Sequence, residues 1–81
     1  MFKIGVVTHY YDKIGVAIID LDGTLSVGDK IKFTKDGDTL FEQVVDSIQI
    51  EHEKKDTAVK GEVIGLKTKE PVKQGTEVFK M

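Results

Sequence analysis

The stretch Leu25–Phe33, LSVGDKIKF, carries the pattern that decides the fold. A glycine lies between two apolar positions, and the same pattern returns near the C-terminus in Val72–Phe79, VKQGTEVF. Gly28 and Gly75 occupy the matching positions, where a residue without a Cβ can take a positive backbone φ and turn the chain into a strand. The two stretches therefore predict two turns that each lead into a β-strand.

The alternation of apolar and polar residues along the chain predicts six strands. They cover Phe2–Tyr11, Ile14–Leu21, Asp29–Thr34, Thr39–Glu51, Glu62–Thr68 and Thr76–Lys80. Side chains in a strand alternate between its two faces, so the apolar positions of one parity are expected to point inward. The predicted core includes Ala17, Ile19, Leu21, Ile31, Phe33, Ile64 and Leu66.

The segments between the strands carry signals of their own. Asp36-Gly37 is typical of a tight hairpin turn. Val45 breaks the alternation of the long fourth strand, which predicts a bulge or a bend at a barrel corner. The most charged run, Glu51–Lys60, is expected to form a loop or a single helical turn, because it is too short for a stable helix.

The overall pattern favours a barrel. No segment shows the sustained 3.6-residue apolar stripe of an amphipathic helix. Many short strands separated by turns favour a sandwich or a barrel, and closure of one small sheet removes its exposed edges. We therefore predict an all-β fold, a six-stranded antiparallel closed barrel that residues 1–81 form as a single domain.

The composition of the 81 residues excludes several kinds of site and partner. The chain has no cysteine, which excludes disulfides and thiolate metal sites and favours a reducing cytoplasm. The N-terminus lacks the apolar run of a signal peptide, and no stretch is long enough for a membrane span. All 12 basic side chains are lysine, so the bidentate arginine contacts that read duplex DNA are missing and no DNA partner is expected.

Charge is unevenly distributed along the sequence. Residues 1–50 hold five lysines and eight acidic residues, a balance of −3, whereas residues 51–81 hold seven and six, a balance of +1. An anionic partner is therefore expected to contact the second part of the chain.

The segment VAIIDLDGTL, residues 16–25, resembles the first motif of the haloacid dehalogenase superfamily. In that family the equivalent of Asp20 is the phosphoryl-accepting nucleophile and that of Asp22 the acid/base, with Mg²⁺ beside them. The family's fold resembles a doubly wound α/β sheet, for which this chain has neither the length nor the helices. We interpret the segment as a strand, a turn and a second strand, and keep a Mg²⁺-dependent phosphatase as a remote alternative.

Four strings spread over residues 2–81 resemble domain II of the translational GTPases, the barrel that follows the nucleotide domain in elongation factor Tu and initiation factor 2. They are IGVVTHYYDKIGVAIIDL, LSVGDKIKF, VVDSIQIEHE and AVKGEVIGLKTKEPVKQGTEVFK. The chain also looks like small stand-alone elongation-factor-like proteins and is similar to the C-terminal barrel of collagenase-like peptidases, in which THYY and SIQIEHE strings recur. The phosphate loop Gly-x-x-x-x-Gly-Lys-Ser/Thr is absent, so GTP binding is not expected. Peptidase activity is not expected either, because the catalytic part of that family lies outside this barrel.

The end of the first strand holds one candidate site. His9, Tyr10 and Tyr11 offer flat rings on which a base or a partner side chain can stack. The alternative is that one tyrosine packs inward and the other rings cap the rim of the barrel. His9 would meet His52 if the first and fourth strands share a rim, and a metal would then need Glu51 or Glu53 as a third ligand. Isolated surface histidines are far commoner, so no metal site is predicted.

The charged run holds the other candidate site. Lys54 and Lys55, together with Lys60, can meet a phosphate backbone as point charges. The alternative is a solvated loop in which the neighbouring acidic residues offset the three lysines.

These observations predict a non-enzymatic binding module without a cofactor, which contacts RNA or the ribosome in translation. The alternative is a protein-interaction module that acts with a separately encoded peptidase-like or modification enzyme. The acidic first half and the lack of arginine favour this alternative.

Overall fold

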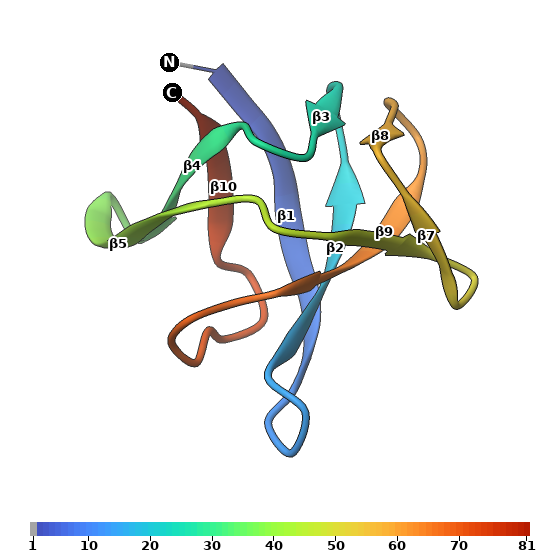
Figure 1. Ribbon diagram of the computed structural model, residues 1–81. Helices are drawn as coiled ribbons and strands as arrows, with labels where there is room; N and C mark the ends of the chain where they lie inside the picture. The colour runs from blue at the N-terminus through green and yellow to red at the C-terminus, as the bar shows by residue number, and fades with distance from the viewer. Residues whose placement is uncertain (1) are drawn as a thin grey trace.

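Ten β-strands, joined by turns and short loops, account for the folded chain in the computed structural model, which describes residues 2–81 (Figure 1). The strands are β1 Phe2–Tyr11, β2 Val16–Leu21, β3 Leu25–Ser26, β4 Lys30–Lys35, β5 Asp38–Val44, β6 Ile48–Ile50, β7 Glu53–Lys55, β8 Thr57–Ala58, β9 Val63–Lys67 and β10 Glu77–Lys80. No helix occurs among the described residues. The predicted all-β fold class is confirmed.

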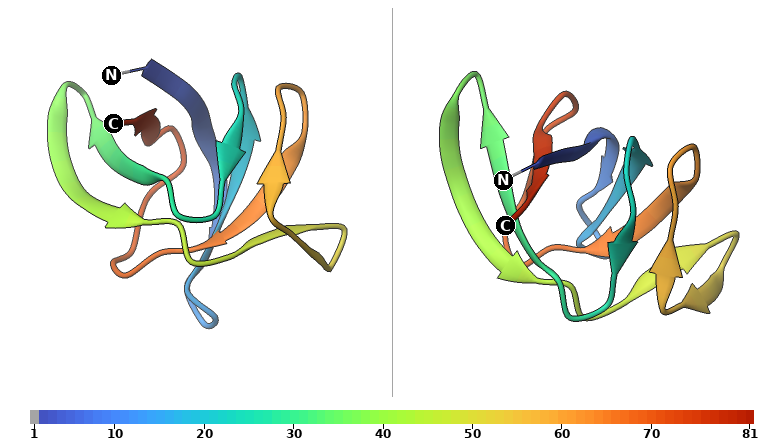
Figure 2. Two further views of the ribbon diagram at one scale, coloured as in Figure 1. Left: turned by 45° about the horizontal axis from the view of Figure 1, so that its top comes forward. Right: turned by 90° about the horizontal axis from the view of Figure 1, so that it is seen from above.

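One main sheet contains eight of the strands, in the order β5-β4-β10-β1-β2-β9-β6-β7, and β3 pairs with β8 in a second small sheet. Every strand pair is antiparallel. Figure 2 shows that the main sheet curls around a single interior. The two chain ends lie together because Phe2 pairs with Lys80.

The closed six-stranded barrel is not confirmed. The main sheet has eight strands, and it ends at β5 on one side and at β7 on the other without a ladder between these ends. The predicted fourth strand is instead divided into β5 and β6 by residues 45–47. β5 pairs with β4, whereas β6 pairs with β9. The bend expected at Val45 is therefore the point where one chain segment passes from one end of the sheet toward the other.

The interior is filled by the side chains that the alternation predicts. Phe33 is fully buried and stacks on Phe41, with the ring centroids 4.7 Å apart. Such side chains each stabilise the fold by about 1.5–3 kcal/mol relative to exposure. The predicted core residues that are buried include Ala17, Ile19, Leu21, Ile31, Phe33, Ile64 and Leu66.

The glycine turns also agree with the sequence. Gly28 and Gly75 have φ values of 95° and 89°, as the repeated pattern predicts. Asp36 and Gly37 both have positive φ, 53° and 85°, which is the mirror-image turn that suits the twist of a hairpin.

Two local expectations are wrong. β2 begins at Val16 rather than Ile14, because Gly15 adopts a φ of 67° and donates its N–H to the carbonyl of Tyr11 at 2.9 Å. The charged run Glu51–Lys60 contains no helical turn: it forms the β6–β7 hairpin and then β8. Tertiary pairing overrides local propensity here, since β6 adds to β9 and Ala58 of β8 pairs with Leu25 of β3.

The Asp-Leu-Asp-Gly-Thr segment lies in an antiparallel setting. Asp20 is in β2 between β1 and β9, and the N–H of Asp22 donates to the carbonyl of Ile4 at 2.7 Å. Parallel strands and covering helices, which a phosphatase of that superfamily needs, do not occur among residues 2–81. The interpretation as a strand followed by a turn agrees with this structure.

Within residues 2–81 there is also no helix long and apolar enough to cross a membrane.

Candidate interaction groove

Five adjacent strands, β1, β2, β9, β6 and β7, place one row of residues on the outer face of the main sheet, which points away from the core. The row follows from the pairing register: His9 lies opposite Ile18, Ile18 opposite Gly65, Gly65 opposite Gln49, and Gln49 opposite Lys54. Directly paired residues in a sheet point to the same face, so these five positions form one cross-strand line. Along this line, the aromatic His9 is followed by the apolar Ile18, by Gly65 without a side chain, by the polar Gln49 and by the basic Lys54.

Gly65 leaves a depression in the middle of this row. A Cβ built there would lie 3.4 Å from Cγ1 of Val16 and 3.9 Å from Cδ1 of Ile18, which are ordinary van der Waals distances. The backbone of Gly65 is also an extended strand conformation open to other residues. The fold therefore does not require glycine at this position. A strand glycine often marks a place where a ligand or another stretch of backbone comes close, and β6 pairs with β9 at this residue through Gln49.

The depression continues into a groove of about 250 Å³, which we call the apolar end. Three of its side chains are large, apolar and unusually exposed for their type: Ile14 at 59%, Val63 at 52% and Tyr11 at 49%. The complete lining comprises Tyr11, Ile14, Val16, Ile18, Gln49, Glu51, His52, Val63, Ile64 and Gly65. These outward side chains favour contact with an apolar group of another molecule.

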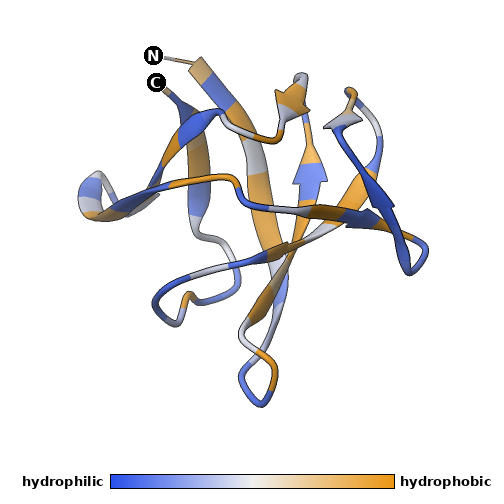
Figure 3. Cartoon of the chain, in the orientation of Figure 1, coloured by the Kyte–Doolittle hydropathy of each residue, from blue (hydrophilic) through white to orange (hydrophobic). Residues whose placement is uncertain are grey.

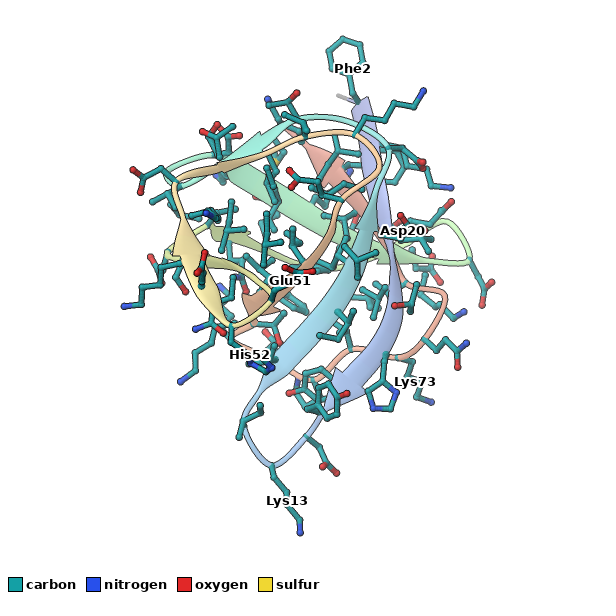
Figure 4. The ribbon with its side chains drawn as sticks, turned by 90° about the vertical axis from the view of Figure 1, so that its right-hand side faces the viewer. Phe2, Lys13, Asp20, Glu51, His52 and Lys73 are labelled. Carbon is teal, nitrogen blue, oxygen red and sulfur yellow. The ribbon has the colours of Figure 1, made fainter. Side chains whose placement is uncertain are left out.

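One wall of the apolar end is the tip of the β6–β7 hairpin. Glu51 and His52 have φ values of 51° and 68°, although neither is glycine. Figure 4 shows this tip beside β2, with Lys13 at the far end of the β1–β2 hairpin. Residues other than glycine in the left-handed region cost about 1–3 kcal/mol each and cluster at functional sites.

A second depression of about 280 Å³ adjoins the first, and we call it the basic end. It shares Val16, Gln49 and Gly65 with the apolar end and adds Ser47, Lys54 and Lys67. Neither lysine has an ion-pair partner among residues 2–81. The two ends together form one groove, hereafter the outer groove, with an apolar part and a positively charged part. Figure 3 shows the same contrast between β7, which is hydrophilic along its length, and the apolar segments of β2.

The structure separates the three aromatic residues at the end of β1. Tyr10 is partly buried against the core, while His9 and Tyr11 point outward and meet edge to face with their ring centroids 4.4 Å apart. A bulge between Val7 and His9 sets this register. The continuous platform of three rings does not form, and only Tyr11 of the three lines the outer groove. Tyr10 packs against the core, as the alternative interpretation expects of one tyrosine.

The two histidines are found on the same outer face, but they come from strands that are not neighbours. β2 and β9 lie between β1, which carries His9, and β6, after which His52 follows. No group of three or more His, Cys, Asp or Glu side chains that could hold a metal is found in residues 2–81.

The neighbouring lysines of the charged run point to opposite faces of β7. Lys54 faces the outer groove, whereas Nζ of Lys55 forms an ion pair with Oε2 of Glu53 at 3.4 Å. Lys60 lies in the exposed turn after β8. The predicted basic cluster is therefore divided.

Sequence reasoning missed Gly65, Ile18 and Lys67, which complete the outer groove. The glycine inside an otherwise β-branched and leucine-rich strand was the available signal, since such a glycine often marks close approach by a ligand or another backbone. Lys67 gave no local signal, because only the pairing of β6 with both β9 and β7 brings it near Lys54.

No protein-family model matches the chain. Among curated proteins, it is 38% identical over 77 residues to an uncharacterized protease of Methanocaldococcus jannaschii. The match covers 95% of this chain but only 19% of that protein, so the chain spans about a fifth of the length of the relative.

Solved structures establish the fold independently. The C-terminal domain of a Geobacillus thermoleovorans protein assigned to the U32 peptidases superposes with a TM-score of 0.90, at 23% identity, over 99% of this chain and 92% of that domain. The selenomethionine variant of that domain gives a TM-score of 0.87, at 22% identity, over 96% and 98% of the two chains. The present chain has the same fold as this domain.

These comparisons correct the expectation drawn from translation factors. They support the resemblance to the C-terminal barrel of collagenase-like peptidases and give no support to domain II of the translational GTPases. The leading expectation of RNA or ribosome contact accordingly has no support, whereas the alternative with a peptidase-like partner agrees with the comparisons.

Proposed function

We propose that residues 1–81 form a single, non-enzymatic protein-interaction module that acts with a peptidase-like enzyme and holds its partner in the outer groove. The observation that carries this proposal is the exposed apolar end beside Gly65, where the fold leaves space that it does not need. Burial of Tyr11, Ile14 and Val63 by a partner would remove apolar surface from water.

The similarity to peptidase-related proteins supports the choice of partner. The matched part of the Methanocaldococcus jannaschii protease is 19% of that protein, and the matched structure is a C-terminal domain. A module with this fold is thus associated with longer peptidase-related chains, and such a chain is therefore the expected partner of the outer groove.

The exposed apolar border of the groove favours a macromolecular partner over a small substrate. Each end has a volume of about 250–280 Å³, and Tyr11, Ile14 and Val63 stay exposed beside the apolar end. A depression of this size accepts one or two side chains of another protein.

Two groove variants test the proposal. The peptidase-like protein of the same organism is titrated in a calorimeter with the unmodified chain and with Ile18→Glu and Val63→Glu, which place a carboxylate in the apolar end. We expect each variant to weaken binding at least about tenfold, the loss typical of a central interface residue.

A matched control separates the groove from general surface charge. Val44 is 49% exposed and lies on β5, outside the outer groove. Val44→Glu should bind as the unmodified chain does. Equal binding by all four proteins would refute the outer groove as the interface, and peptide hydrolysis by the unmodified chain alone would refute a non-enzymatic role.

A further inference from the structure

We infer that the outer groove recognises an extended segment of the partner in which an aliphatic residue and an aspartate or glutamate lie two positions apart. The inference rests on the proposed function and specifies the chemistry of the partner. It follows from the order of chemical groups along β9.

The aliphatic residue is assigned to the position above Gly65. The missing side chain leaves room there between Val16, Ile18 and Val63, and all three present methyl groups. A leucine or isoleucine side chain buried at this point would gain roughly 1.5–3 kcal/mol from the loss of contact with water.

The carboxylate is assigned to the basic end. Lys54 and Lys67 line it from two strands, and neither ammonium group is paired within the described part of the chain. A partner carboxylate between them would make charge-assisted hydrogen bonds that no side chain of this protein supplies.

The spacing follows from strand geometry. Gly65 and Lys67 are two residues apart in β9 and face the same side, which places them roughly 7 Å apart along the strand. An extended peptide that lies along β9 has the same repeat, so two residues that are two positions apart face Gly65 and Lys67. The acidic residue follows the apolar one if the peptide runs parallel to β9 and precedes it if the peptide runs antiparallel.

The charge distribution also selects against a nucleic acid. Nucleic-acid sites neutralise successive phosphates with positive charge and stack the bases on aromatic rings. The apolar end instead carries the carboxylate of Glu51 and the exposed methyl groups of Ile14 and Val63. One negative charge fits the groove, whereas a row of negative charges does not.

Peptide probes test the inference by NMR titration of the isotope-labelled chain. The acetylated and amidated peptides Ser-Leu-Gly-Asp-Gly-Ser and Ser-Asp-Gly-Leu-Gly-Ser, one for each direction along β9, are compared with versions in which Lys replaces Asp or Gly replaces Leu. We expect one of the two Asp peptides to shift the amide signals of Gly65 and Lys67. Replacement of its Asp should weaken binding about fivefold, the upper effect of one exposed ion pair, and replacement of its Leu at least about tenfold, because the apolar burial is lost.

Protein variants locate the contact. Lys67→Glu should reverse the preference, so that the Lys peptide binds more tightly than the Asp peptide. Gly65→Leu fills the apolar end and should abolish the binding of every peptide. Lys55→Glu is the matched control, because Lys55 lies on β7 next to Lys54 but faces away from the groove, and it should leave the Asp peptide's affinity unchanged.

The outcomes separate this inference from the proposed function. If Ile18→Glu loses the peptidase-like protein while Lys67→Glu keeps it and the peptides show no preference, the inference is refuted and the proposed function stands. Tighter binding of a peptide that ends in Ser-Leu-Gly with a free carboxylate would refute an internal segment. Shifts at Lys54 and Lys67 with a single-stranded RNA probe, and none with the peptides, would also refute the inference.

Discussion

Single residues decide whether the outer face of the sheet is filled or open. Gly5 and Gly65 are both strand glycines, yet their surroundings differ. A Cβ at Gly5 would lie 2.8 Å from the carbonyl oxygen of Asp20, a clash with backbone that cannot move aside. A Cβ at Gly65 meets side chains at ordinary distances. Glycine is therefore a requirement of the fold at the first position and a feature of the surface at the second.

The contrast predicts opposite effects of the same substitution. Gly65→Ala should leave the free energy of unfolding unchanged or raise it by about 0.4–1 kcal/mol, since alanine restricts the unfolded chain without strain in the folded one. Gly5→Ala should lower the same quantity by about 1–3 kcal/mol because it overpacks the sheet. Urea unfolding followed by circular dichroism measures both. A loss of more than 1 kcal/mol for Gly65→Ala would mean that glycine at this position serves the fold.

At the scale of elements, two hairpins of the same kind are built from different residues. The β4–β5 turn uses Asp36-Gly37, the pair that suits positive φ at both positions, whereas the β6–β7 turn uses Glu51-His52 at similar angles. The second turn thus keeps a conformation that its residues disfavour. Pairing of β6 with β9 and of β7 with β6 holds it there.

Replacing the disfavoured pair should stabilise the protein. The double variant Glu51→Asn, His52→Gly supplies the residues that this turn prefers, so we expect the urea midpoint to rise, with a gain of about 1–2 kcal/mol in the free energy of unfolding. The matched comparison is Gly37→Ala in the other hairpin, where nothing lies within 4 Å of the added Cβ. This variant should lose about 1–2 kcal/mol from backbone strain alone. An unchanged midpoint for the double variant would mean that the Glu51-His52 turn carries no strain.

At the scale of the whole molecule, a side chain supplements the incomplete hydrogen-bond ladder. Gln43 at the end of β5 donates from Nε2 to the carbonyl of Lys67 at 2.8 Å and accepts at Oε1 from the N–H of Lys69 at 2.9 Å. Together with the bend at 45–47, this amide links the β5 end of the main sheet to β9. The sheet is open as a ladder but is held in its curled form by these links.

Removal of the amide should loosen one end of the sheet. Gln43→Ala loses both hydrogen bonds and should lower the free energy of unfolding by about 1–2 kcal/mol. Amide hydrogen exchange should become faster in β5 and remain slow in β1 and β2, which lie in the centre of the sheet. The control is Gln74→Ala, an exposed glutamine in the turn before β10. Uniformly faster exchange across all strands would contradict a local link.

The sequence by itself determined the fold class, the positions of the glycine turns and the inward set of residues. These features are local. Alternate residues of a strand share a face, and a turn that needs a positive φ selects glycine at that position. The resemblance to the barrel of collagenase-like peptidases was also readable from short strings. The strand count was not, because β3 and β8 are two residues each and carry no pattern of their own. A bend also divides the predicted fourth strand into β5 and β6, and the charged run forms β7.

Only the tertiary structure decided how the sheet ends and where the outer groove lies. Strand order depends on contacts between residues far apart in sequence, and the register of β2, β9, β6 and β7 brings Ile18, Gly65 and Lys54 into one row. A shift of one residue in any of these strands would turn its side chains to the other face. The outer groove therefore depends on the register between the strands, and no single strand determines it.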